Sequence, residues 1–160
     1  MKGESVQIGL AGEYHVLAQL AQRGLLGSLT LSNTKGVDIL LFNPHKDRLF
    51  RVEVKTTKLA PVSERLFGAE RFYIWQMNEK HESCVEQKLV FCFVHLRAPG
   101  ERPDFFLVPS ADVAKYVRWQ HQHWLDTRSK PVASTSMRKF RIEESDPRAY
   151  RENWAIFDTS

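Results

Sequence analysis

Three charged residues lie within or beside apolar stretches of this sequence, where an ionised side chain is costly unless a partner compensates it. Asp38 follows Gly36-Val37, and Glu53 and Lys55 are separated by one valine, Val54. Mg²⁺ takes one or two carboxylates together with water and phosphate oxygens. Asp38 and Glu53 are therefore candidate ligands of a divalent cation held against a phosphate, and the backbone carbonyl of Val54 is a further candidate ligand.

The chemistry that such a set supports is hydrolysis of a phosphodiester bond. This reaction needs an activated water, neutralisation of the charge on the transition state, and help for the leaving oxygen. A divalent cation lowers the pKa of water and shields the developing charge. The ammonium group of Lys55 would orient the attacking water or help to deprotonate it, and would stabilise the phosphorane.

The segment 48–57 predicts the β-strand that carries two of these groups. Side chains alternate between the faces of a strand, so Glu53 and Lys55 share a face and lie about 6.5 Å apart. Turn-forming residues separate this strand from a second predicted strand, 37–43, which indicates a hairpin. In one register Asp38 lies beside Glu53 or Lys55 on the same face, whereas a slip of one residue moves it to the other face.

The N-terminal segment 4–23 predicts a helix that adds a fourth group. Its apolar residues recur at spacings of three, four and seven: Val6, Leu10, Leu17 and Leu20. Glu13 falls inside this stripe on a helical wheel and is expected to point at the sheet. A carboxylate in that position needs a counter-charge, which Lys55 or a bound metal would supply.

Each feature also has a simpler interpretation. A Glu-x-Lys pair on a strand is usually exposed, an Asp after Gly is usually a turn residue, and a Glu on an apolar helix face usually pairs with Arg or Lys. Convergence of all four groups on one sheet face favours a functional site. An unrelated α/β interaction domain, with Glu53 and Lys55 as a surface ion pair, predicts instead that Asp38 and Glu13 lie far from Glu53.

The order of these residues resembles that of the PD-(D/E)xK nuclease superfamily, and is most similar to its Holliday junction resolvase-like branch. The matching residues fill the first third of the chain: the helical Glu13, then Gly36-Val37-Asp38, then Val52-Glu53-Val54-Lys55-Thr56. The resemblance implies a restriction endonuclease-like α/β fold, with a central mixed β-sheet flanked by helices. Val37 stands where the family has proline, at a position without a chemical role.

The resemblance also implies an activity and a cofactor. It implies a metal-dependent endonuclease acting on DNA, with branched DNA as a candidate substrate. Asp38 and Glu53 would bind Mg²⁺, for which Mn²⁺ would substitute, Lys55 would assist hydrolysis, and Glu13 would act in the outer shell of the metal. The alternative is a non-cutting nucleic-acid-binding or assembly module on the same fold, which has no obvious need for the intact acidic–acidic–basic set. A homodimer is expected by analogy.

The rest of the chain predicts extensions of this core within one domain, 1–160, whose motif core is 4–57. Further strands are predicted at 28–32, 72–75, 88–96, 105–108 and 139–142. Helices are predicted at 110–125, capped by Ser110, and at 147–153, and the whole reads as a mixed α/β sheet domain.

Basic residues near the C-terminus are candidates for contacts with nucleic acid. Lys115 and Arg118 lie on the polar face of the helix 110–125, with Trp119 close by, so phosphate contact and base stacking are both available. The alternative is a solvated face, with Trp119 packed under the following segment or in a dimer contact. A basic arm, 126–141, carries the other candidates: Arg128, Lys130, Arg138, Lys139 and Arg141.

Composition permits these interpretations without requiring them. The net charge of +4 allows a polyanionic partner. No apolar run approaches the roughly 20 residues that span a bilayer, and the N-terminus lacks the apolar core of a signal peptide, so a cytoplasmic protein without a membrane partner is expected. Cys84 and Cys92 have no metal-type spacing. The histidines, His81 among them, are isolated or poorly spaced and are not candidate site residues.

Overall fold

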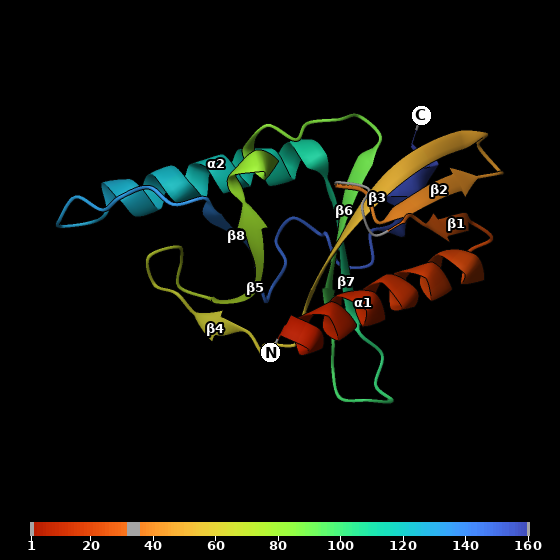
Figure 1. Ribbon diagram of the computed structural model, residues 1–160, viewed down its shortest axis with the longest axis horizontal. Coiled ribbons are helices and arrows are strands. Elements are labelled where there is room, and N and C mark those ends of the chain that lie inside the picture. The colour runs from red at the N-terminus through yellow and green to blue at the C-terminus, as the bar shows by residue number, and fades with distance from the viewer. Residues whose placement is uncertain (1, 32–35, 160) are drawn as a thin grey trace.

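A five-stranded mixed β-sheet forms the centre of the computed structural model, which describes residues 2–31 and 36–159 (Figure 1). Its strand order is β1-β2-β3-β6-β7, in which β3 and β6 are parallel and the other neighbours are antiparallel. The strands are β1 (Leu26–Leu29), β2 (Ile39–Asn43), β3 (Arg48–Thr57), β6 (Leu89–His95) and β7 (Asp104–Pro109). The predicted hairpin is confirmed as the β2–β3 pair. Ser32, where the first predicted strand was expected to end, lies outside the described residues.

A smaller antiparallel sheet, β4-β5-β8, packs beside the first. It consists of β4 (Val62–Ser63), β5 (Arg71–Asn78) and β8 (Met137–Glu143). The helices are α1 (Lys2–Gln22), α2 (Ser110–Asp126) and the 3₁₀ helices η1 (Glu79–Glu82) and η2 (Trp154–Asp158). Within the described part of the chain, no helix combines the length and the apolar character needed to cross a bilayer.

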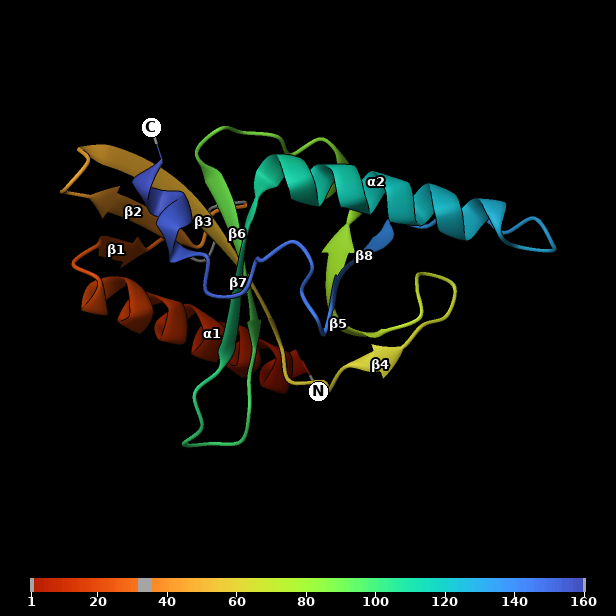
Figure 2. The same ribbon diagram turned by 180° about the vertical axis from the view of Figure 1, so that it is seen from behind.

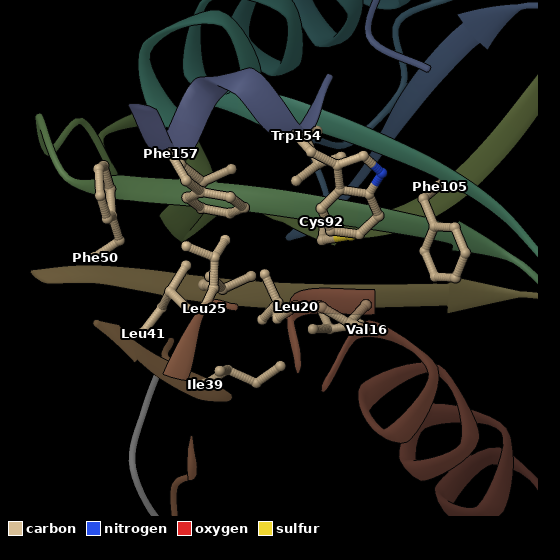
Figure 3. Packing of buried hydrophobic residues seen from close by; sticks show 14 of the residues in the cluster. Val16, Leu20, Leu25, Ile39, Leu41, Phe50, Cys92, Phe105, Trp154 and Phe157 are labelled. Atoms are coloured by element: carbon tan, nitrogen blue, oxygen red, sulfur yellow. The ribbon is translucent and has the colours of Figure 1, made fainter. Parts of the chain in front are cut away.

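The two faces of the central sheet have different covers. On one face, α1 and η2 pack against inward side chains of the sheet such as Leu41 and Cys92 (Figure 3), and Val52 and Val54 belong to the same cluster. The side chain of Asn43 donates a hydrogen bond to the Phe157 carbonyl (2.9 Å) and so ties η2 to the hairpin, which it flanks in Figure 2. On the other face, β5, β8 and α2 cover Phe91 and Phe93. The prediction of a central mixed sheet flanked by helices is confirmed.

The buried face of α1 differs from the predicted stripe. Val6 is 70% exposed and Leu10 is 40% exposed, whereas Val16 and Leu20 are fully buried. The contact with the sheet runs through glycine instead: a Cβ atom on Gly12 would lie 1.9 Å from the Thr56 Oγ1 atom of β3. An apolar pattern cannot reveal this face, because the residue that permits the closest approach has no side chain.

Gly12 therefore supplies the first testable prediction. We expect Gly12→Ala to lower the free energy of unfolding by roughly 1–3 kcal/mol, because the new methyl group overpacks the contact between α1 and β3. Thr56→Ala in the same chain should recover part of the loss. Gly9→Ala is the matched control: no atom of the described residues lies within 4 Å of its Cβ position, and alanine is the better helix former, so a gain of about 0.5–1 kcal/mol is expected. Urea denaturation measures all three, and equal effects of the two alanines would contradict the packing argument.

Two local predictions are wrong. The segment 147–153 is not a helix, because Ala149 and Glu152 adopt positive φ angles (54° and 55°) and Arg151 forms a β-bridge with Phe106. Ser110 does not cap α2. Its hydroxyl is instead used by the backbone of Glu86, donating to the carbonyl (2.7 Å) and accepting from the amide (2.9 Å).

Candidate active site

Strand β3 holds Glu53 and Lys55 on the face that looks toward the second sheet. Glu53 is 2% exposed, and the register places it beside Phe91 of β6. The Lys55 Nζ atom lies 2.6 Å from the Glu53 Oε1 atom. A carboxylate this deeply buried requires compensation. The interpretation of Glu53 and Lys55 as a surface ion pair is therefore wrong.

Asp38 immediately precedes β2, at the point where that strand begins. Its amide donates to the Val52 carbonyl (2.9 Å), and its Oδ2 atom accepts from the Val54 amide (2.6 Å). The Asp38 carboxylate thus accepts the hydrogen bond that a backbone carbonyl of β2 would accept from the Val54 amide if that strand pairing continued. Because the amide and the carbonyl of one strand residue point to the same side of the strand, the Val54 carbonyl is also directed toward the side on which Asp38 lies.

The electrostatic surroundings connect Asp38 with the Glu53–Lys55 pair. Burial raises the pKa of the Asp38 carboxyl above its ordinary value, and the negative charge of Glu53 adds to the rise. The Val54 amide and the cations Lys55 and Lys80 oppose it. A Cβ atom on Gly36 would lie 3.7 Å from the Glu53 Oε2 atom. The Gly36–Asp38 turn therefore lies directly against Glu53.

Glu13 approaches Asp38 from the other face of the sheet. Helix α1 covers the Val52 and Val54 face, whereas Glu53 belongs to the other face, so the expectation that all four groups share one face is wrong. Burial raises the pKa of Glu13, and the charge of Asp38 raises it further. Asp38, just before β2, is therefore close enough to act electrostatically on Glu13, which lies on one face of the sheet, and on Glu53, which lies on the other.

The two oxygens of the Glu53 carboxylate have different surroundings. Oε1 lies within reach of Lys55 and of the His81 Nε2 atom (3.1 Å). Oε2 is buried and, among residues 2–31 and 36–159, has no hydrogen-bond partner. A buried acceptor without a partner costs about 1–3 kcal/mol, and more when it is charged. A cation at Oε2 would remove this cost, so the residues present fit a metal ion.

The donor set suits magnesium better than a metal that needs many protein ligands. Among the residues that the structure describes, no three His, Cys, Asp or Glu side chains are grouped so that they could hold a metal ion. Mg²⁺ needs only one or two carboxylates, since it keeps several waters. Asp38, Glu53 and the Val54 carbonyl meet that requirement.

His81 and Lys80 were missed by the sequence reasoning. Both belong to η1, which is capped by Asn78 and lies between β5 and the site. His81 is 2% exposed and contacts Glu53, while the positive charge of Lys80 lowers the pKa of Asp38. The Asn78-x-x-His81 spacing is a capping-box pattern, but histidine is not its usual fourth residue. The sequence signal was therefore weak.

A groove with a volume of about 700 Å³ opens beside Lys55. It is lined by the first turns of α1, the end of β3 and the second sheet. Lys58 and Lys139 lie along it, each paired with a glutamate: Lys58 with Glu4, and Lys139 with Glu64 at 3.4 Å. Of the basic residues predicted to touch nucleic acid, Lys139 is the one that lines this groove with Lys55.

The other predicted contacts lie elsewhere. Lys115 is exposed, and Trp119, 47% exposed, stacks on His123 at 5.1 Å rather than being hidden beneath the following segment. Arg118 donates to the Glu82 carbonyl. Arg128 lies over the Trp124 ring (4.3 Å), and Lys130 is exposed in the loop before β8.

Arg138 and Arg141 do not belong to an exposed basic arm. Both are buried in β8, with 5% and 7% of their surface exposed. Arg138 is paired with Glu82 of η1 (2.5 Å), and Arg141 is paired with Glu64 and donates to Gln120 (2.9 Å). Arg138 and Arg141 are three positions apart and so point to opposite faces of β8, and each is buried there against a carboxylate partner within the protein.

Comparison with known proteins places the fold among nuclease structures. No protein-family model and no curated protein matches the chain. A solved structure of a bacterial homing endonuclease, I-Ssp6803I, is similar with a TM-score of 0.52, over 94% of this chain and 88% of that one. The two sequences are 14% identical, so the likeness concerns the fold.

Proposed function

We propose that this protein is a metal-dependent endonuclease that hydrolyses phosphodiester bonds in DNA, and that it belongs to the PD-(D/E)xK superfamily. The observation that carries the proposal is the state of Glu53: a buried carboxylate beside the Asp38 turn, with one oxygen held by Lys55 and the other without a hydrogen-bond partner in the part of the chain that the structure describes. The overall similarity of the fold to a homing endonuclease supports it.

Asp38, Glu53 and the Val54 carbonyl would hold the metal. When bound, Mg²⁺ would supply charge neutralisation and a lowered pKa for water. Asp38 is fixed for this task by the Val54 amide, and burial raises the pKa of its carboxyl, an effect that a bound cation would oppose. Glu13 would hold a water at the far side of Asp38.

Lys55 would act on the water and the phosphate. Its side chain is 27% exposed, so the ammonium group touches both the buried Glu53 and the open groove. From there it can donate to a phosphate oxygen and orient an attacking water. Lys80 of η1, whose positive charge lowers the pKa of Asp38, would also attract the negatively charged phosphate.

The groove beside Lys55 is our proposed path for the nucleic acid. Lys58 and Lys139 would contact phosphates after exchanging their glutamate partners for the substrate, since exposed ion pairs contribute little to stability. Contacts to phosphates are made without reading sequence. Lys115 and Trp119 on α2 remain candidates for an additional contact outside the groove.

A cleavage assay tests the proposal. The purified protein is incubated with supercoiled plasmid and with a synthetic four-way junction, in Mg²⁺, in Mn²⁺ and in chelator. We expect cleavage with either metal and none in chelator. Cleavage that persists in chelator, or survives Asp38→Asn, would contradict the proposed site. Binding without cleavage under every condition would favour the non-cutting module instead.

A further inference from the structure

We propose that His81 is a positioning residue of this site: it holds Glu53 by Oε1 and so leaves Oε2 as the oxygen that meets the metal. The inference rests on the proposed function for its consequences in cleavage. Its structural basis is independent of that function. It lies in three contacts around η1.

The first contact joins His81 directly to Glu53. The Nε2 atom lies 3.1 Å from the Glu53 Oε1 atom, and only about 2% of the surface of either residue is exposed. The imidazole packs edge-on against Phe91, with ring centroids 5.7 Å apart. Water is thus largely excluded from the bond, and the ring has little freedom to turn away.

The second contact fixes the proton on the histidine nitrogen that faces Glu53. The backbone amide of Asn78 donates to the Nδ1 atom (2.9 Å), which makes Nδ1 an acceptor in the neutral ring and leaves the proton on Nε2. In the protonated ring, Nδ1 can donate instead to the Asn78 carbonyl, 3.0 Å away. In both forms Nε2 carries a proton, so His81 donates to Glu53 whatever its charge.

The third contact is the anchoring of η1 itself. The Asn78 side chain accepts from the Lys80 amide (3.2 Å), which completes a capping box with His81. At the other end, Arg118 of α2 donates to the Glu82 carbonyl and Arg138 of β8 pairs with the Glu82 carboxylate. A short helix held from two elements forms a rigid support for the imidazole.

Two donors therefore converge on one oxygen of Glu53. Lys55 and His81 both face Oε1, so a rotation of the carboxylate that exposed Oε1 to a metal would break both interactions. Partners of this kind, which hold a metal ligand from behind, typically change metal affinity or activity by 10–100-fold when removed. A merely structural histidine, which only ties η1 to β3, would change stability without changing metal affinity.

The test compares metal affinity in matched variants of the whole chain. His81→Leu removes the donor, whereas His81→Gln places an amide N–H close to the position of Nε2. His121→Leu is the control, because His121 is also buried and lies near η1 but bonds to Ser134 and not to Glu53. Mn²⁺ binding is measured by titration calorimetry, the melting temperature without metal is measured in parallel, and Glu53→Gln is the reference for loss of the site.

We expect His81→Leu to weaken Mn²⁺ binding by about 10–100-fold, with His81→Gln within a few-fold of wild type and His121→Leu unchanged. Saturating Mn²⁺ should restore most of the cleavage rate of His81→Leu. If His81→Leu does not fold, His81→Asn, whose amide is too short to reach Glu53, replaces it in the comparison with His81→Gln.

Equal Mn²⁺ affinity in wild type and in the folded leucine or asparagine variant would overturn the positioning role, while leaving the nuclease proposal intact. Mn²⁺ binding that requires His81 in a wild-type protein that cuts no DNA would support the role and reject the nuclease. A wild type that binds no Mn²⁺ would reject both.

Discussion

Glu53→Gln is expected to lower DNA cleavage by about 10³-fold or more at saturating substrate. Removal of a metal ligand forfeits several kcal/mol of transition-state stabilisation, and about 4 kcal/mol corresponds to that factor. Glutamine is nearly isosteric and keeps an acceptor for Lys55 and His81, so the fold should persist. The control is Glu152→Gln, since Glu152 is also a paired carboxylate, bonded to Arg102 (2.7 Å) away from the site. Single-turnover cleavage with a labelled duplex measures both variants.

The same substitution has a second signature, in the pH dependence of stability. Burial alone would raise the pKa of Glu53, but the hydrogen bond from His81 and the charge and hydrogen bond of Lys55 lower it to about 2. A carboxyl whose pKa falls on folding stabilises the protein above the unfolded pKa, near 4.5, and this contribution is lost as the pH falls toward 2. The loss amounts to about 3 kcal/mol.

Acid titrations of wild type and Glu53→Gln should therefore diverge. We expect the wild type to lose stability more steeply than the variant between pH 5 and about pH 2. The raised pKa values of Asp38 and Glu13 act in the opposite direction in the wild type, so the comparison of the two proteins is needed. Parallel stability curves would show that folding leaves the pKa of Glu53 unchanged, which would contradict its stabilisation by His81 and Lys55.

Lys55→Met has the second large expected effect. We expect cleavage to fall by about 10²–10³-fold, because the site loses the cation that faces the phosphate. Metal binding should weaken no more than in His81→Leu, since Lys55 and His81 both hold Glu53 at Oε1, but saturating Mn²⁺ should not restore cleavage, because the missing cation acts on the phosphate. Methionine keeps the length and apolar stem of lysine, so the packing along β3 is conserved.

The pair of measurements separates the roles of the two residues. Glu53→Gln should lose both Mn²⁺ affinity and cleavage, whereas Lys55→Met should lose cleavage even at saturating Mn²⁺. Lys55→Arg is also expected to be impaired, because a planar guanidinium cannot occupy the place of a compact ammonium group. Recovery of Lys55→Met cleavage at saturating Mn²⁺ would indicate that the lysine organises the site instead of acting on the substrate.

The sequence predicted the β2–β3 hairpin and the shared face of Glu53 and Lys55, because strand alternation and turn chemistry are local signals. It did not predict the course of α1, since the close contact at Gly12 leaves no apolar side chain to recognise. It also placed Asp38 on a face, whereas the carboxylate lies between β2 and β3 and accepts from the Val54 amide in place of a strand partner. That position depends on where β2 begins, which no periodicity fixes.

The supporting residues were the hardest to foresee. His81 lies 28 positions after Glu53 in a short 3₁₀ helix, and nothing in its neighbourhood in the sequence distinguishes it from other histidines. Arg138 and Arg141 were expected in a basic arm because the prediction followed from their charge alone and did not take account of their burial in β8. Tertiary pairing with Glu82 and Glu64 decides their surroundings, and sequence patterns do not contain those partners.

Crystals soaked in Mn²⁺ test the central claim most directly, because anomalous scattering locates the ion without reference to activity. The account predicts a manganese peak in contact with the Asp38 carboxylate and the Glu53 Oε2 atom, with Lys55 and His81 still on Oε1. An ordered manganese ion bound elsewhere, or one bound by the Glu53 oxygen that Lys55 and His81 hold, would contradict it.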